Sequence, residues 1–150
     1  MKLSKKIRSI ILIILLIISS VLLLITKSQK DVLQERIDLV FTDAISDSMG
    51  GLNKDYSKLN LDEKSQLYYQ TMSNLHDALE VFHATSYRKY DDMFLVLNKL
   101  YIHLLTNKDT SYEIKHKLYI FEFLGKILVF PEDIKLITDF NNFLDGKDAQ

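Results

Sequence analysis

Two copies of the pattern Glu-x-x-His are the residues in this sequence whose types and spacing best suit chemistry: Glu80 with His83, and Glu113 with His116. On a helix this spacing places a carboxylate and an imidazole one turn apart, and helical bundles that hold two iron ions use it on two of their helices. At about 100° per residue, however, His83 points to the flank of its helix's apolar stripe, and His116 points nearly opposite to its own. A metal-binding helical-bundle enzyme or sensor that uses these four ligands is therefore the alternative hypothesis.

The remaining catalytic inventory is small. The sequence has no Cys, no Gly-rich phosphate loop, no Ser in a nucleophile-elbow pattern and no His-Glu-x-x-His zinc pair. We therefore expect no enzymatic activity, no cofactor, no metal site and no small-molecule substrate. The lack of Cys also excludes structural disulfides and a lipid-modified Cys anchor. His103 falls on the side of its helix away from the apolar stripe, so we expect it to be exposed.

An uninterrupted apolar stretch lies near the N-terminus. Residues 10–26 contain no charged residue, no Gly and no Pro, and residues 7–26 supply the roughly 20 positions that a helix needs to cross about 30 Å of hydrocarbon. The residues that follow match a signal-peptide cleavage site poorly, so cleavage is the less favoured interpretation. Basic residues precede the stretch, and the positive-inside rule then predicts a cytoplasmic N-terminus and an extracytoplasmic remainder. These topology determinants are Lys2, Lys5, Lys6 and Arg8.

The two parts of the chain differ in charge. Residues 1–27 carry five Lys or Arg and no acid, whereas residues 28–150 carry 14 bases against 20 acids, a balance of about −6. Such an acidic balance gives no reason to expect nucleic-acid binding, which needs a clustered basic face. High Lys, Ile and Asn without Trp favours an AT-rich genome, and we interpret the source as bacterial.

The apolar helix is expected to continue beyond the membrane. No Gly or Pro interrupts residues 27–48, and Gly50-Gly51 should end the helix and begin a loop. Apolar residues recur at helical spacing in this segment and predict a buried stripe. The stripe consists of Leu33, Ile37, Val40, Ala44 and, on its edge, Phe41.

Two further helices are predicted next along the chain. Asn60 and Glu63 match a capping box ahead of a helix over 61–84, and apolar residues in the same rhythm predict a helix over 87–106. Because the link between them is short and their apolar stripes are narrow, we expect an antiparallel hairpin.

The segment 110–129 allows two interpretations. Thr110 and Glu113 form a second capping-box pattern, and apolar residues on two sides of the following helix predict that it is the central, most buried one. The alternative is a β-hairpin near 119–130 with its turn at Gly125, because β-prone residues flank this glycine. We favour the helix because it is capped and the strands would not alternate cleanly.

A last helix is expected after Pro131, which is tolerated in a first helical turn, and Gly146 should end it. Its expected buried face consists of Ile134, Ile137, Phe140 and Leu144.

The sequence thus predicts an all-α protein whose N-terminal transmembrane helix continues into an extracytoplasmic bundle of four or five helices. The alternative is an α+β fold with the hairpin near 119–130. The expected organisation is a cytoplasmic stub, a membrane anchor, a helical domain and a disordered tail. These segments span 1–6, 7–26, 27–146 and 147–150, respectively.

Many aromatic side chains and few chemical groups favour recognition over turnover. We expect a single-pass cell-membrane protein whose partners are the lipid bilayer and another membrane or cell-surface protein. It would act as a subunit or regulator of a membrane complex, or as an immunity or exclusion factor. The tyrosines expected to contact the partner are Tyr56, Tyr69, Tyr87 and Tyr112.

Overall fold

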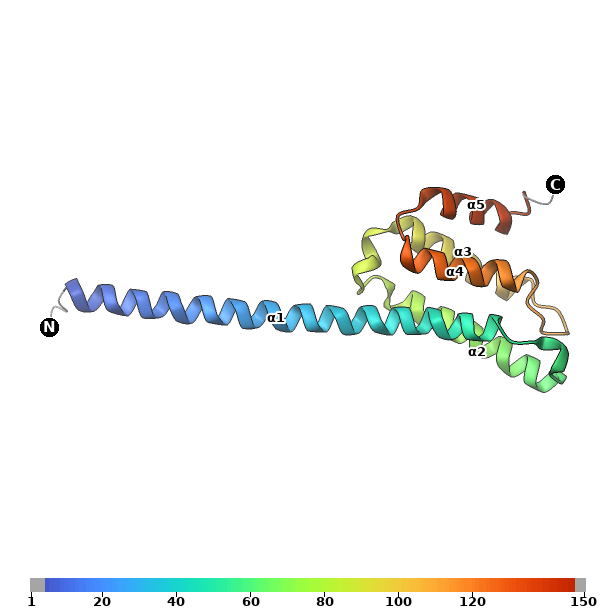
Figure 1. Cartoon of the computed structure of the whole chain (residues 1–150), viewed down its shortest axis with the longest axis horizontal. Coiled ribbons are helices and arrows are strands. Elements are labelled where there is room, and N and C mark those ends of the chain that lie inside the picture. The colour runs from blue at the N-terminus through green and yellow to red at the C-terminus, as the bar shows by residue number, and fades with distance from the viewer. Residues whose placement is uncertain (1–4, 148–150) are drawn as a thin grey trace. The chain divides into compact units, whose positions relative to one another are not determined.

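The computed structural model describes residues 5–147, with side chains at position 10 and positions 12–147. Within this range the chain forms α-helices and short 3-10 turns and no strand (Figure 1), so the all-α prediction is confirmed and the hairpin near 119–130 is wrong. The side chains of Lys2, Lys5, Lys6 and Arg8, and residues 148–150 of the expected tail, lie outside the described part. The α-helices are α1 (Lys5–Leu52), α2 (Leu61–Phe82), α3 (Asp91–Thr106), α4 (Lys117–Val129) and α5 (Ile134–Leu144), with 3-10 turns η1 (Tyr56–Lys58) and η2 (Ser86–Lys89).

The chain divides into two units, Met1–Arg36 and Ile37–Gln150. In the first unit, the part of α1 from 12 to 25 is apolar on nearly all sides, and all its side chains are exposed. The helix has a window of mean hydropathy 2.2 of which 0% is buried, and it is long and apolar enough to cross a membrane. The hydroxyls of Ser20 and Thr26 each donate to a carbonyl one turn earlier at 2.9 Å, which satisfies them within the helix.

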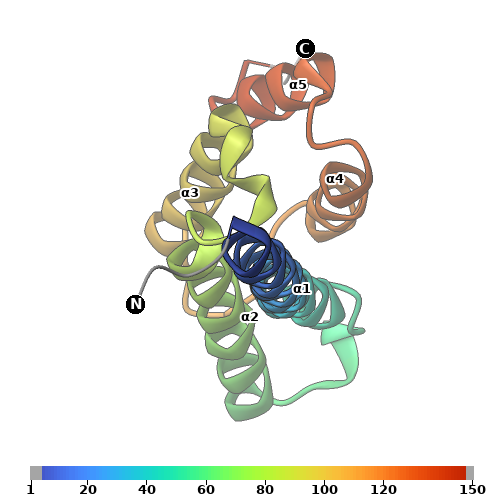
Figure 2. The same ribbon diagram turned by 90° about the vertical axis from the view of Figure 1, so that its left-hand side faces the viewer.

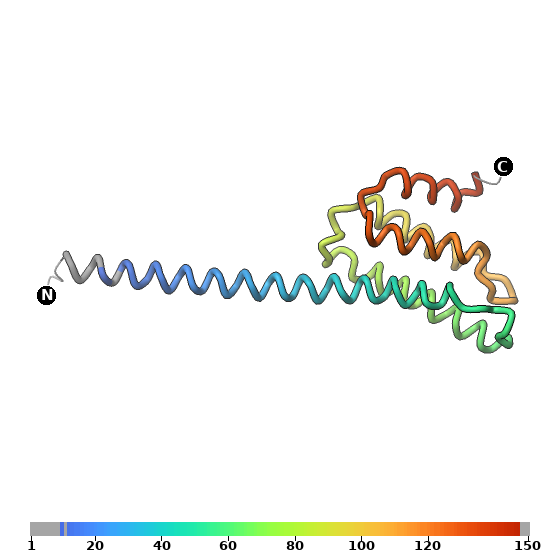
Figure 3. The backbone as a smooth tube through the Cα atoms, viewed as in Figure 1, coloured from blue at the N-terminus to red at the C-terminus, as the bar shows by residue number. Residues whose placement is uncertain are grey.

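The second unit begins inside α1, which continues without interruption to Leu52 (Figure 3). Its buried positions here repeat at steps of four and three: Phe41, Ile45, Ser48 and Leu52. The buried face therefore differs from the predicted stripe. Leu33 and Val40 are exposed, and Ile37 and Ala44 are half-buried. Other parts of the chain pack only against the Phe41 side of the helix. Periodicity alone does not reveal which side of a helix is covered.

Gly50 and Gly51 lie within α1 and do not end it. A Cβ on Gly51 would come within 2.0 Å of the Thr71 hydroxyl of α2, whereas a Cβ on Gly50 would meet nothing within 4 Å. At this crossing the Ser48 hydroxyl donates to the carbonyl of Thr71 at 3.2 Å. The glycine at 51 thus permits a close approach of two helices.

Helices α2 and α3 form the predicted antiparallel pair. The Asn60–Glu63 capping box is present, with both of its hydrogen bonds made, at 2.8 and 3.0 Å. Tyr68 near the start of α2 donates to the Leu104 carbonyl near the end of α3, at 2.6 Å. Helix α3 begins later than predicted, because Thr85 caps the turn η2 and the chain enters helix only at Asp91.

Helix α4 departs most from prediction, since it begins at Lys117 and not at 110. The Asp109 carboxylate accepts hydrogen bonds from the amide and hydroxyl of Ser111, at 2.9 and 2.6 Å, which fixes a turn where a helix was expected. Tyr112 and His116 then adopt left-handed backbone with φ of 55° and 56°, a conformation that interrupts a helix.

The expected two-sided burial of α4 is also wrong. Its buried side chains lie on one face, and Leu118 and Phe130 from the two predicted stripes are exposed. Helix α3 packs against α2 and α5 (Figure 2), and α5 also packs against α4. The buried residues of α4 are Ile120, Phe123, Leu124 and Ile127.

Helix α5 starts with an Asp133 cap, whose carboxylate accepts from the Leu136 amide at 2.9 Å. Ile137, Phe140 and Leu144 are buried as predicted, whereas Ile134 is exposed. The helix gives way to Gly146 at φ +69°, in agreement with the predicted stop.

Different contacts hold the two ends of the second unit. At the proximal end, where the unit begins in α1, the Ser86 amide of η2 donates to the Asp38 carboxylate at 2.7 Å. Helices α3 and α5 run in the same direction (Figure 1), and Lys99 of α3 pairs with Asp145 after α5 at 2.6 Å. Their C-terminal ends and the 107–116 link therefore meet at the opposite, distal end (Figure 1).

Candidate functional site

The four residues of the Glu-x-x-His pairs do not converge. Glu80 lies 3.8 Å from His76 on its own helix, and His83 packs on Phe94 with ring centroids 4.5 Å apart. The Glu113 carboxylate forms an ion pair with Lys64 of α2. His116 precedes α4 and faces the ring of Phe143. In the described residues, no group of three or more His, Asp or Glu is placed to hold a metal ion.

The four tyrosines expected to contact a partner differ in exposure. Tyr69 is 51% exposed, and Tyr87 and Tyr112 are half-buried. Tyr56 was assigned to the surface wrongly: it is only 5% exposed, because the loop after α1 folds it inward. Burial raises the pKa of the Tyr56 hydroxyl to about 12, and this hydroxyl is the one buried side-chain polar atom without a hydrogen-bond partner in the described residues.

Tyr69 and Tyr112 come together with Lys108 at the surface. The Lys108 ammonium donates to the Tyr69 hydroxyl at 2.8 Å and lies 5.0 Å from the centre of the Tyr112 ring. This hydrogen bond raises the pKa of Lys108 and lowers that of Tyr69. The cluster presents tyrosine rings, a residue type that is enriched at protein interfaces, beside a cation that lies over them.

The same line of contacts continues between α2 and α3. His76 stacks on Tyr101 with centroids 5.4 Å apart, and His83 packs on Phe94. We call these pairs, together with the Tyr69–Lys108–Tyr112 cluster, the aromatic seam. The two ring pairs join the α2 side to α3, and the cluster joins α2 to the 107–116 link, so the seam runs along the helical hairpin.

Beside the seam, the outer face of α3 carries three exposed apolar side chains, with the half-buried Asn98 between two of them. Leu95, Ile102 and Leu105 are 59%, 49% and 55% exposed. At about 100° per residue they lie within about 80° of one another around the helix axis. We call these residues the α3 face. Single exposed apolar residues are common, but a set aligned on one helix face is typical of a contact surface.

Sequence reasoning missed the α3 face although a signal was present. The segment 95–105 reads LVLNKLYIHLL, which is apolar on nearly every side. Such a helix is normally fully buried. In the structure its buried side is occupied by Met93, Val96, Leu97, Leu100 and Leu104, so the remaining apolar residues are left in solvent.

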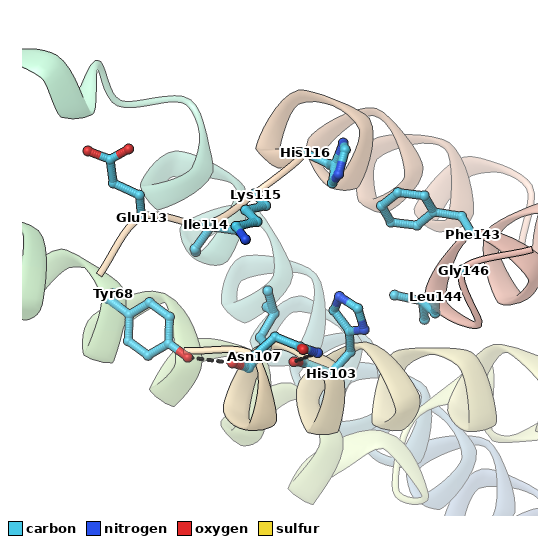
Figure 4. A pocket seen from close by; sticks show the side chains of 11 residues that line it. Tyr68, His103, Asn107, Glu113, Ile114, Lys115, His116, Phe143, Leu144 and Gly146 are labelled. Carbon is cyan, nitrogen blue, oxygen red and sulfur yellow. Dashed lines mark hydrogen bonds between the residues drawn. The ribbon is translucent and has the colours of Figure 1, made fainter. Parts of the chain in front are cut away.

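A cleft of about 490 Å³ opens at the distal end of the second unit. Figure 4 shows His103 and His116 pointing into it from α3 and from the link ahead of α4, while the Glu113 carboxylate points away from its centre. The Tyr68–Leu104 hydrogen bond and the bond from the Asn107 amide to the His103 carbonyl, at 2.8 Å, fix its lower wall. Its apolar lining is Tyr68, Leu104, Ile114, Phe143 and Leu144, and its remaining polar lining is Asn107 and Lys115.

His103 is half-buried and not exposed as expected, because α5 and the link cover one side of it. Burial lowers the pKa of its imidazole, and the positive charges of His116 and Lys99 lower it further. At neutral pH the cleft therefore presents a neutral His103.

None of the protein-family models, curated proteins or solved structures compared with this chain matches it. The features that bear on function are therefore those of the chain itself: the exposed apolar part of α1, the α3 face with the aromatic seam, and the distal cleft.

Proposed function

We propose that this chain is a single-pass membrane protein whose helical domain lies outside the cytoplasm and binds another protein of the membrane or cell surface. Its role would be that of a subunit or regulator of a membrane complex, or of an immunity or exclusion factor. The apolar part of α1 is the anchor, and the α3 face with the aromatic seam is the contact surface.

The anchor is supported by the cost of the alternative. Residues 12–25 expose Ile, Leu and Val on all sides, at about 25 cal/mol for each Å² of apolar surface left in water. A bilayer removes that cost, and the backbone needs no partner from the lipid because its hydrogen bonds are made within the helix. Tethering then raises the effective concentration of the domain for partners in the same membrane.

The α3 face is the observation that carries the partner proposal. Leu95, Ile102 and Leu105 expose aliphatic surface beside the Tyr69–Lys108–Tyr112 cluster, so apolar area and polar anchoring groups are adjacent. Interfaces combine an apolar centre, in which aromatic residues are enriched, with a polar rim.

Site-specific photocrosslinking in living cells tests the contact. A photoreactive amino acid at Ile102 should give a defined adduct with one membrane or surface protein. The same probe at Glu122, an exposed residue on α4, is the matched control and should give none. A second substitution, Leu105→Lys, should abolish the Ile102 adduct, because it places a charge at the centre of the contact.

The two roles differ in when the adduct forms. A subunit or regulator should crosslink in unchallenged cells, whereas an exclusion factor should crosslink only when the incoming agent is present. Equal adducts from Ile102 and Glu122, or an Ile102 adduct that survives Leu105→Lys, would contradict the assignment of this face.

A further inference from the structure

We propose that the distal cleft binds a small carboxylate with an apolar body, as a ligand site separate from the α3 face. The apolar body would lie against Leu104, Ile114 and Leu144, and the carboxylate would be held by the imidazoles of His103 and His116. The proposal does not depend on the partner contact, because the cleft lies at the end of α3 and the α3 face lies along its outer side.

The shape of the cleft fits such a ligand. Its volume of about 490 Å³ falls within the roughly 300–1,000 Å³ typical of small-molecule sites. Leu104 and Ile114 are only 6% exposed and Leu144 8%, so the apolar wall belongs to the packed core and is preformed. An aliphatic group that enters the cleft would cover this wall without rearrangement.

The polar side of the cleft carries nitrogen donors. His103 and His116 point into it from opposite sides, and Lys115 also lines it (Figure 4). The nearby carboxylates are engaged elsewhere: Glu113 pairs with Lys64, and Asp145 pairs with Lys99 at 2.6 Å and with Lys147 at 3.1 Å. An anion therefore meets potential donors, and the nearest carboxylates, including that of Glu113 in the lining, are already paired with lysines.

Protonation should accompany binding. A carboxylate between the two rings favours the charged imidazolium over the neutral imidazole, so the rings take up protons when the ligand binds. The charged groups beside the imidazoles are Lys99 of α3, whose charge acts on His103, and Lys115 and Glu113 of the link. The affinity should consequently rise as the pH falls from about 7.5 to about 5.5.

The test uses the full-length chain in lipid nanodiscs and follows the histidine ring signals by NMR. The probe is 4-methylpentanoate, and its neutral amide of the same shape is the matched control ligand. We expect saturable shifts of the His103 and His116 signals with the acid and at least about tenfold weaker binding of the amide, since hydrogen bonds to an ionised partner are stronger than those to a neutral one. Partition of ligand into lipid does not produce this result, because the readout is two identified imidazoles.

Variants assign the effect to the cleft. The double variant His103→Asn with His116→Asn should bind the acid at least about tenfold more weakly, with binding followed by the Ile114 methyl signals. The variant His83→Asn removes the histidine that directly follows α2, outside the cleft, and should bind as the unmodified chain does.

A second probe, N-acetyl-leucine, carries the same carboxylate as the C-terminal residue of a polypeptide. Tighter binding of this probe than of 4-methylpentanoate would identify a polypeptide C-terminus as the source of the ligand, and the reverse would identify a free acid. The proposal is overturned if the acid gives no saturable shift on the unmodified chain, if the amide binds equally well, or if His83→Asn weakens binding as much as the double variant.

Discussion

Residues 12–25 and residues 37–147 use the same aliphatic side chains in the same secondary structure, but their surroundings differ. In the first region every described Ile, Leu and Val is exposed, whereas in the second the helices enclose a core that includes Phe41, Phe82 and Phe140 at 0% exposure. Helix formation is therefore not what separates the two regions. The difference lies in what covers the apolar surface: the domain's own side chains in one case and, as we propose, lipid in the other.

The comparison also shows how one helix can serve two environments. In α1 the apolar residues lie on all sides up to residue 25, and from Phe41 onward the buried ones are confined to one face. A helix that is apolar all round needs an apolar solvent, and an amphipathic one needs a protein partner. Substitutions on either side of this transition should therefore have opposite consequences for membrane retention and for folding.

The largest effect is expected from charges in the first region. Ile14→Arg with Ile18→Arg should move the chain from the membrane to the soluble fraction, because each Arg at the centre of a span costs roughly 2.5–3.5 kcal/mol. The same pair of charges at Gln29→Arg and Leu33→Arg should leave it in the membrane. Fractionation by ultracentrifugation after alkaline extraction measures both, and an equal loss for the two pairs would remove the distinction between anchor and domain.

A core substitution should have the reverse pattern. The ring centroid of Phe41 lies 5.7 Å from that of Phe82 and 5.0 Å from that of Tyr87. Phe41→Ala should therefore lower the free energy of unfolding by about 3–5 kcal/mol while the chain stays in the membrane. The neighbouring Val40→Ala, at an exposed position, should change it by less than about 0.5 kcal/mol. Urea unfolding of the reconstituted chain, followed by circular dichroism, compares them, and a similar loss for both would contradict the assigned buried face.

The two adjacent glycines give a smaller and opposite pair of effects. Gly51→Ala should destabilise the domain by about 1–3 kcal/mol, because the new methyl group collides with the buried Thr71. Gly50→Ala should stabilise it by about 0.5–1 kcal/mol, since it meets open space and favours the helix. The same unfolding experiment measures the difference, and equal effects would mean that α1 and α2 do not approach closely at Gly51.

The smallest expected difference concerns two buried tyrosines. Tyr68→Phe removes the 2.6 Å hydrogen bond to the Leu104 carbonyl and should cost about 1 kcal/mol. Tyr56→Phe removes a hydroxyl that makes no hydrogen bond within the described residues, so stability should be unchanged or slightly higher. Thermal unfolding of the two variants side by side checks the order, and a larger loss at position 56 would reverse it.

The sequence was most informative where local chemistry decides the structure. The Asn60–Glu63 capping box, the stop at Gly146 and the helical character of 119–129 were all predictable, because each depends on residues close together in the chain. The helix start predicted at Thr110 is wrong for the same kind of reason. The Asp109 carboxylate accepts hydrogen bonds from the Ser111 amide and hydroxyl, which stabilises a turn in place of a helix.

The contact surfaces could not be predicted in the same way. Burial of Tyr56 and exposure of Leu95 depend on which elements pack beside them, and periodicity fixes the spacing of a stripe but not its partner. The link that lines the distal cleft has left-handed backbone at Tyr112 and His116. Residues other than glycine rarely adopt this conformation, and no sequence motif predicts it here. The residues that line it come from four separated segments of the chain.

Cysteine labelling in intact cells tests the proposed anchor most directly, since the chain contains no Cys and a single introduced thiol is unique. Two variants are needed, Thr138→Cys in the helical domain and Ser4→Cys ahead of the apolar stretch, each exposed to a maleimide that does not cross membranes. Our account predicts that Thr138→Cys is labelled in intact cells and Ser4→Cys only after permeabilisation, with both chains in the membrane fraction. Labelling of Thr138→Cys only after permeabilisation, or recovery of a soluble chain that lacks its apolar N-terminal stretch, would contradict it.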